Sequence, residues 1–291
     1  MPATAHQELR HADEVDRGER FEFGKNWQAF LDVLDEERIA DAERSLQQML
    51  GVDSLSGRSF LDAGSGSGLF SLAARRLGAE RVRSFDFDPS SVACTRELRR
   101  RYFPDDPAWE VEEASVLDED FVRGLGRWDV VYSWGVLHHT GAMWRALDHV
   151  QSAVSDDGLL FLSIYNDQGY KSRLWRLVKR TYNRLPGSLR PLWTAAVMGP
   201  YLLLDFAKTA AGGGAIRFLR SWTDDRGGER GMSRWHDLTD WVGGYPFEVA
   251  KPEQVFDFLR DRGFVLQRLF TAGGGLGCNE YVFRRSASPG M

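Results

Sequence analysis

A glycine-rich stretch with one acidic side chain, FLDAGSGSG at Phe60 to Gly68, has the residue types to bind a cofactor. The segment from Ser59 to Leu61 predicts the end of a buried strand, and Leu69 to Leu77 carries apolar residues at helical spacing. Glycines between a strand and a helix let the backbone adopt positive φ and let a ligand approach closely, while unpaired N–H groups at the helix start face that ligand. The stretch therefore predicts a site for a nucleotide or an anionic cofactor.

The spacing of these glycines narrows the class of cofactor. A dinucleotide fingerprint is G-x-G-x-x-G, whereas here the glycines are Gly64, Gly66 and Gly68, and Leu69 stands where the third dinucleotide glycine would be. Asp62 precedes the first glycine by two positions. The spacing thus disfavours a nicotinamide cofactor, and the alternative without chemistry is a glycine-rich turn that binds no ligand.

An acidic side chain follows the second predicted strand. Asp86 lies 22 residues after Gly64, close to the roughly 20-residue separation at which an acid accepts hydrogen bonds from ribose hydroxyls. Asp88 is the competing assignment, but its place before a proline and a serine is typical of a turn that caps a helix. Asp86 is therefore the preferred ribose ligand.

Three residues at the second and third strand ends could surround an adenine ring. Phe87 could lie against the adenine face, Ser115 could meet the adenine amino group, and the Val116 N–H could meet a ring nitrogen. The alternative for each is an ordinary turn at the end of a strand.

Two adjacent histidines, His138 and His139, follow the fourth predicted strand. Side chains at i and i+1 point apart, so the pair is not spaced to bind zinc, and we expect only one to face a site. A neutral imidazole there could take a proton from a hydroxyl nucleophile, because histidine titrates near neutral pH. His139 is the candidate base, and a packed structural histidine is the alternative.

A second group of polar and aromatic side chains stands between Gly231 and Glu248, with turn-forming Gly-Gly and Tyr-Pro pairs near its end. Such a segment can shape a pocket for a polar, ring-like substrate, and the alternative is a structural loop. The candidate substrate contacts are Arg234, Asp237 and Tyr245, and His236 beside Asp237 is a further contact and a second candidate base.

Alternating strands and helices position these groups. From Arg58 to Asp167 they alternate with short links, which predicts right-handed βαβ units and a parallel, doubly wound sheet. Ligands in such sheets lie outside the carboxyl ends of the strands. Before the first strand we expect a loosely ordered leader at residues 1 to about 19, an aromatic-rich helical segment from Phe21 to Leu31 that could cover the cofactor, and a helix from Asp35 to about Leu50. The buried face of that last helix is predicted to hold Ile39, Ala42, Leu46 and Met49.

The alternation stops between Asn166 and about Val249, which predicts a mainly helical insert. Its first helix, Lys171 to Arg184, is predicted to be amphipathic. The expected apolar stripe holds Leu174, Leu177, Val178 and Tyr182, and the basic residues elsewhere are Lys171, Arg173, Arg176, Lys179, Arg180 and Arg184. The apolar run from Leu192 to Leu204 is shorter than the roughly 20 residues of a spanning helix. The insert is interpreted as a substrate lid, with peripheral membrane contact through 171–211 as one expectation and a solvated helical cap as the alternative.

Composition sets wider bounds on the function. The net charge of −5 argues against nucleic acid as the main partner, because phosphate binding needs a basic surface. Two cysteines, Cys94 and Cys278, are too few for a disulfide framework and have no partner at metal-ligand spacing. The polar N-terminal 20 residues carry no apolar secretory segment. A cytoplasmic protein without a metal site is the resulting expectation, and association with a membrane stays open.

Together the strand ends FLDAGSGSG, FDFDPS, EEASVLD and DVVYSWGVLHHT resemble the class I S-adenosylmethionine-dependent methyltransferases. They are most similar to the branch of ubiquinone-biosynthesis-like, small-molecule methyltransferases. The resemblance covers roughly residues 58 to 167 and, with a gap, the C-terminal strands. It implies a Rossmann-like, seven-stranded sheet with an antiparallel last strand, and S-adenosylmethionine as the cofactor.

The resemblance also implies roles for single residues. Gly64, Ser65 and Gly66, after Asp62, would lie along the methionine part of the cofactor. Asp86 would hold the ribose, and Trp134 would lie near the sulfonium. The expected adenine contacts are Phe87, Ser115 and Val116, although many family members have Asp where Ser115 stands. The Asn/Asp-Pro-Pro-aromatic motif of nucleobase-amino methyltransferases is replaced by Trp-Gly-Val-Leu, which argues against nucleobase acceptors.

The sequence thus predicts an S-adenosylmethionine-dependent methyltransferase that methylates an oxygen of a small metabolite, a glycan unit or a lipid-linked intermediate. Nitrogen and carbon acceptors stay open. The other classes are a nicotinamide-dependent oxidoreductase and a non-catalytic S-adenosylmethionine-binding protein. The predicted organisation is an N-terminal leader and helical cover at 1–50, a cofactor-binding core at 51–167, a helical lid at 168–249, and a C-terminal helix with the closing strands at 250–291.

Overall fold

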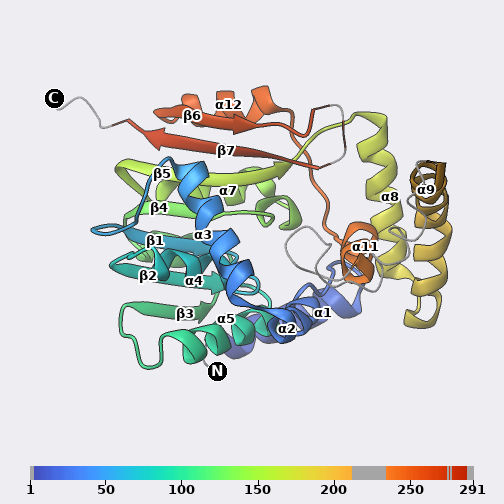
Figure 1. Cartoon of the computed structure of the whole chain (residues 1–291), viewed down its shortest axis with the longest axis horizontal. Coiled ribbons are helices and arrows are strands. Elements are labelled where there is room, and N and C mark those ends of the chain that lie inside the picture. Colours follow the sequence, from blue (N-terminus) through green and yellow to red (C-terminus); the bar gives the residue numbers. More distant parts are fainter. Residues whose placement is uncertain (1–2, 212–233, 274, 276, 287–291) are drawn as a thin grey trace.

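The computed structural model describes residues 3–211, 234–273, 275 and 277–286, with the backbone alone described for a few helical residues. A seven-stranded sheet in the order β3-β2-β1-β4-β5-β7-β6 forms its centre (Figure 1). The strands are β1 (Ser59–Ala63), β2 (Arg81–Asp86), β3 (Trp109–Glu113), β4 (Trp128–Ser133), β5 (Val154–Tyr165), β6 (Phe264–Phe270) and β7 (Cys278–Arg285). Strands β1 to β5 are parallel, and β7 is antiparallel to both β5 and β6. The predicted Rossmann-like sheet with an antiparallel last strand is confirmed.

Helices cover both faces of this sheet, so neighbouring residues of a strand enter different cores. Phe60 packs on one side with α3 (Glu36–Leu50), α4 (Leu69–Arg76) and α5 (Pro89–Tyr102). Leu61 packs on the other side, where the covering helices are α6 (Glu119–Gly124), α7 (Met143–Ser152) and α12 (Pro252–Arg260). Central strands buried on both faces need continuous apolar runs, as in the Leu-Leu-Phe-Leu segment of β5.

Helix α3 shows how local sequence sets an element that supports the sheet. The side chain of Asp35 accepts the Arg38 N–H at the N-cap, and Gly51 ends the helix in the left-handed conformation. The predicted buried face is confirmed, because Ile39, Ala42, Leu46, Met49 and also Leu50 are buried. This face packs against α4 and the β5 side of the sheet.

The N-terminal segment differs from the expected loosely ordered leader. Residues Ala3–Asp16 form helix α1, and Gly24–Val33 form α2, both near the carboxyl ends of the parallel strands (Figure 1). The Gly24 N–H donates to the Asp88 carboxylate at 2.7 Å, and Arg20 donates to the His139 carbonyl at 3.1 Å. These contacts with distant residues hold the segment, and a local hydrophobic pattern could not reveal them.

The insert between β5 and α12 contains α8 (Tyr170–Arg184), the short 3-10 helix η2 (Gly187–Leu189), α9 (Arg190–Ala211) and α11 (Arg234–Gly243). Figure 1 shows α8 and α9 beyond the carboxyl ends of the strands. None of the described helices is both long and apolar enough to cross a membrane.

The predicted apolar stripe of α8 was wrong for Leu174 and Leu177, which are exposed, and right for Tyr182, which is buried, and Val178, which packs against the insert cluster. The other buried residues of the helix are Ser172, Trp175, Lys179 and Asn183. The burial of two large aromatic side chains, spaced i and i+7, outweighs that of the leucines, because the rings meet other aromatic residues of the insert.

Replacement of Leu46 by Ala tests the packing of α3 on the sheet. Leu46 is fully buried, so the lost contacts and the remaining cavity should lower the free energy of unfolding by about 2–5 kcal/mol. Urea denaturation measures this, with the exposed Glu37→Ala as the control. A loss below about 1 kcal/mol would contradict the observed packing.

Candidate functional site

A cavity of about 460 Å³ lies over the carboxyl ends of β1, β2 and β4, in the size range of small-molecule sites. The order of the sheet reverses between β1 and β4, which is where open α/β sheets bind ligands. Every cofactor-binding residue predicted from the sequence lines this cavity, together with His139. They are Asp62, Gly64, Ser65, Gly66, Asp86, Phe87, Ser115, Val116 and Trp134.

The glycine-rich loop forms one wall, and its conformation requires glycine. Gly64, Gly66 and Gly68 have φ angles of +88°, +53° and +83°. A Cβ atom on Gly64 would collide with the side chain of Val136, and one on Gly66 would lie 3.2 Å from the Trp27 ring. The loop therefore brings its backbone to the cavity without side chains in the way.

Asp86, at the end of β2, holds the glycine-rich loop in place through a hydrogen bond. One carboxylate oxygen accepts the Gly66 N–H and the other accepts the Asp88 N–H, both at 2.9 Å. Burial, followed by the nearby charge of Asp88, raises the pKa of Asp86 to about 6. Asp88 instead caps α5 through the Ser90 N–H and receives the Gly24 N–H. This division of roles favours Asp86 over Asp88 as the ribose ligand.

Asp62 ends a buried chain of hydrogen bonds. The Trp109 indole donates to Ser84 Oγ at 2.9 Å, the two hydroxyls of Ser84 and Ser71 are 2.7 Å apart, and Ser71 donates to Asp62 Oδ2 at 2.5 Å. Asp62 Oδ1 is buried and accepts no hydrogen bond from the described residues. Burial above all, with the charge of Asp86, raises the pKa of Asp62 to about 7.

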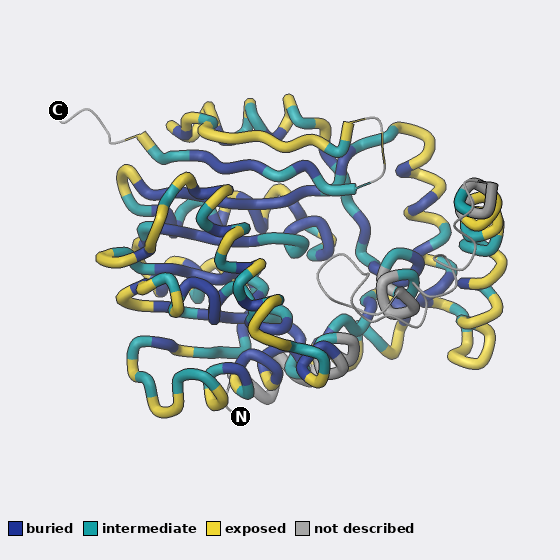
Figure 2. The backbone as a smooth tube through the Cα atoms, viewed as in Figure 1, coloured by how far each residue is buried: buried dark blue, intermediate teal, exposed yellow. Residues whose placement is uncertain are grey.

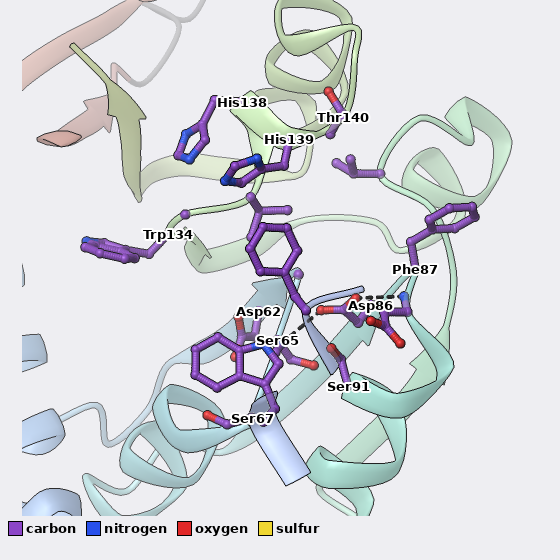
Figure 3. Close-up of a pocket in the computed structure, with 18 of the residues that line it drawn as sticks. Asp62, Ser65, Ser67, Asp86, Phe87, Ser91, Trp134, His138, His139 and Thr140 are labelled. Atoms are coloured by element: carbon purple, nitrogen blue, oxygen red, sulfur yellow. Dashed lines mark hydrogen bonds between the residues drawn. The ribbon is translucent and has the colours of Figure 1, made fainter. Parts of the chain in front are cut away.

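The two histidines lie across the cavity from Asp62 and Ser65 (Figure 3). His139 Nδ1 is 2.6 Å from the Pro246 carbonyl oxygen. A carbonyl oxygen can only accept, so Nδ1 carries the hydrogen and Nε2 of the neutral ring carries the lone pair. His138 also lines the cavity and packs on Tyr165 at 4.1 Å between ring centroids. The expectation that only one histidine faces the site was wrong, because the pair lies on the 3-10 turn η1 (Leu137–His139).

The adenine candidates form one end of the cavity. The Phe87 ring is contacted by the Arg20 guanidinium at 4.9 Å and by His11 at 5.4 Å. Ser115 Oγ accepts the Leu117 N–H at 3.2 Å. A planar base could lie between an aromatic ring and the apolar Val116 in this corner, which is the predicted arrangement.

The predicted substrate contacts are not all brought to the cavity. Arg234, His236 and Asp237 lie on α11, but their side chains are outside the part of the chain that the structure describes. Tyr245 is absent from the described cavity lining, because it packs in the aromatic cluster of the insert.

Several cavity residues were missed from the sequence. Phe23, Tyr165 and Trp241 form aromatic walls near the histidines. Glu280, at the start of β7, also lines the cavity and accepts the Trp134 indole N–H at 2.9 Å. Tyr165, at the end of β5, and Glu280, near the start of β7, lie at the same edge of the sheet as the glycine loop. The register of β7 against β5 was needed to find them, and the local sequence does not give this register.

Lys179 of α8 was expected to face solvent and instead is fully buried. Its Nζ lies 5.1–5.9 Å from the ring centroids of Phe247, Tyr165, Trp241 and Trp175, and it donates to the Trp241 carbonyl. Tyr165 and Trp241 are cavity walls, so this cation–π cluster fixes the side of the cavity next to the insert.

A family model described as "Methyltransferase domain" matches residues 34–196. Among curated relatives, ribosomal protein L11 methyltransferase of Alteromonas mediterranea is 32% identical over 130 residues, 40% of this chain and 44% of that protein. The tRNA U34 carboxymethyltransferase of Methylococcus capsulatus is 31% identical over 120 residues, 41% of this chain and 36% of that protein. The chain thus spans less than half the length of these relatives.

Two solved structures share the fold at low sequence identity. Magnesium protoporphyrin IX methyltransferase from Synechocystis PCC 6803, with bound SAH, is 15% identical with a TM-score of 0.50, covering 85% of this chain and 83% of that one. PKMT2 from Rickettsia typhi is 13% identical with a TM-score of 0.56, covering 85% and 53%. The prediction of a class I S-adenosylmethionine-dependent methyltransferase is confirmed for the family and the fold.

Asp62→Asn tests the ionisation of the buried carboxyl. The pKa of Asp62 is about 7 in the folded chain, above the ordinary value of about 3.9 for aspartate, so ionisation of Asp62 lowers the stability of the fold as pH rises between these two values. The variant should therefore gain stability over the wild type between about pH 4 and 7, reaching on the order of 2–4 kcal/mol at pH 8. Urea unfolding at pH 5 and pH 8 measures this, with the exposed Asp53→Asn as the control. An equal difference at both pH values would contradict the raised pKa.

Proposed function

The chain belongs to the methyltransferase domain family, and from that premise we propose that it transfers a methyl group from S-adenosylmethionine to an oxygen of a small metabolite, a glycan unit or a lipid-linked intermediate. The observation that carries the proposal is a single cavity lined by the glycine-rich loop, by Asp62 with its buried oxygen, and by Asp86. Membership of this family disfavours the nicotinamide oxidoreductase.

The residues present fit the proposed cofactor. Asp62 Oδ1, which has no described partner, would accept the ammonium group of the methionine part, and the loop at Gly64 to Gly66 would let that part approach the backbone. Asp86 would hold the ribose hydroxyls. Phe87, Ser115 and Val116 would surround the adenine, and Trp134 would lie near the sulfonium. The cofactor supplies an electrophilic methyl group.

The chain itself must hold the acceptor and remove its proton. We propose that Nε2 of His139 takes this proton from the acceptor. Nε2 has a free lone pair, because the Pro246 carbonyl holds the ring hydrogen on Nδ1. Phe23, Tyr165 and Trp241 would exclude water and orient a ring-like acceptor. His236 stays a second candidate base on the sequence alone, with Arg234, Asp237 and Tyr245 as proposed acceptor contacts.

The walls of the cavity support a small acceptor. The whole cavity, about 460 Å³, must hold the cofactor as well, so its aromatic end suits a small molecule or the end of a larger one. The names of the curated relatives indicate ribosomal protein and tRNA acceptors for those proteins, and the net charge of −5 disfavours RNA here. Cytoplasmic location is part of the proposal. Membrane contact through 171–211 would bring a lipid-linked acceptor within reach, although the transfer reaction itself does not require it.

Isothermal titration with S-adenosylmethionine, S-adenosylhomocysteine and NAD tests the cofactor. Both sulfur nucleotides should bind and NAD should not. Asp86→Ala should weaken binding roughly tenfold or more, because two hydrogen bonds of the ribose to a carboxylate are lost. Asp53→Ala, on the exposed surface, is the matched control. Binding of NAD alone, or of none of the three, would refute the proposal.

Label transfer from S-adenosylmethionine with a tritiated methyl group tests the reaction. Incubation with lipid, polysaccharide, small-molecule, RNA and protein fractions of a bacterial extract should label one of the first three. His139→Gln should lower the rate 10²- to 10⁴-fold while cofactor affinity stays unchanged, because only the base is removed. His138→Gln, the neighbouring histidine, is the control. Labelling of RNA or protein alone, or a larger loss with His138→Gln, would show that the acceptor or the base is misassigned.

A further inference from the structure

Exposed residues occur along α8 and α9 (Figure 2), and the large apolar ones among them form an exposed surface on the insert. We call this surface the outer face and define it by Tyr170, Leu174, Leu177, Leu192 and Leu203, which are 57–70% exposed. Tyr170, Leu174 and Leu177 recur at i, i+4 and i+7 and so form one stripe along α8. Large apolar side chains that gather on one surface indicate an interaction site.

A row of basic side chains runs beside this stripe. Arg173, Arg180 and Arg184 are exposed and recur at i, i+7 and i+11, which places them along a neighbouring line of the helix. Neither these three nor Lys171 form an ion pair with any described carboxylate. Helix α8 contains no acidic residue, although the whole chain has a net charge of −5.

Several exposed arginines elsewhere on the described surface pair with carboxylates. On α5, Arg100 and Arg101 both pair with Glu97, and on α12 Arg260 pairs with Asp257. On α8, three exposed arginines without a described carboxylate lie beside exposed leucines, and this combination calls for a partner that is both anionic and able to take up apolar side chains.

We propose that the outer face docks on the surface of an anionic lipid bilayer. Leucine and tyrosine side chains would enter the interface, while the arginine row would meet the anionic headgroups. A second copy of the chain fits less well, because a symmetric contact would place two basic rows opposite each other. That the docked enzyme acts on a lipid-linked acceptor rests on the proposed function; the docking itself does not.

The inner side of the same helix connects this surface to the cavity. Trp175 and Lys179 of α8 pack with Trp241 and Tyr165, and the latter two line the cavity near the histidines. Docking through α8 therefore places the acceptor side of the cavity near the headgroups, one helix diameter from the bilayer surface. This is where the polar part of a lipid-linked molecule would be presented.

Flotation with vesicles of phosphatidylcholine, alone or with 30% phosphatidylglycerol, tests the docking with the full chain. Binding is expected only to the anionic vesicles and should fall between 50 and 500 mM NaCl, because salt screens the headgroup charge. Leu174→Glu with Leu177→Glu should weaken binding at least roughly tenfold. Arg173→Gln, Arg180→Gln and Arg184→Gln together should weaken it roughly 100-fold, about fivefold for each charge.

Matched variants outside the insert, on β6 and on α5, control for surface chemistry. Val265→Glu with Leu269→Glu, also exposed apolar residues, and Arg100→Gln with Arg101→Gln should bind as the wild type does. Circular dichroism and urea unfolding report whether each variant is folded. Equal binding by the α8 variants, or no binding to anionic vesicles, would overturn the proposal. Dimerisation that the leucine variants abolish, without vesicle binding, would overturn it in favour of a second copy. Vesicle binding by a protein that fails to bind the sulfur nucleotides would support docking and refute the proposed function alone.

Discussion

Two carboxylates at the carboxyl ends of adjacent strands are the constraint on which this molecule depends. Asp62 is buried and Asp86 is half-buried, and loss of surrounding water is the main cause that raises the pKa of each. Such burial costs stability unless each charge finds hydrogen bonds or a cation. Asp86 finds two backbone N–H groups, one of which fixes the glycine loop. Asp62 keeps one oxygen without a described partner, and a cationic group of a ligand would satisfy it.

The N-terminal segment that contains α1 and α2 contacts both the cofactor end and the acceptor end of the cavity. At the cofactor end, the Gly24 N–H binds Asp88, which also caps α5. At the acceptor end, Arg20 binds the His139 carbonyl, and Phe23 packs on the His139 ring at 4.9 Å. Helices α1 and α2 therefore belong to the site as much as the sheet does. One enclosed space for donor and acceptor suits a displacement that needs alignment and little else from the protein.

The sheet, and the residues from the strand ends that line the cavity, could be predicted because their signals are local. Glycine spacing, an acid after a strand and alternating elements depend on backbone geometry within a few residues, as for Gly64 and Asp86. The orientation of α8 could not be predicted. Helical spacing alone does not decide whether Leu174 or Trp175 is buried, because the surface that α8 packs against is itself aromatic. Contacts across long sequence distances, such as Glu280 with Trp134, have no local signal.

A crystal structure of the chain with S-adenosylhomocysteine tests the proposed cofactor site most directly. We expect the homocysteine amino group at Asp62 Oδ1, the ribose hydroxyls on Asp86, and the adenine between Phe87 and Val116. The thioether would then point toward Trp134 and the histidines. A ligand bound outside this cavity, or bound within it with the ribose away from Asp86, would contradict the central claim.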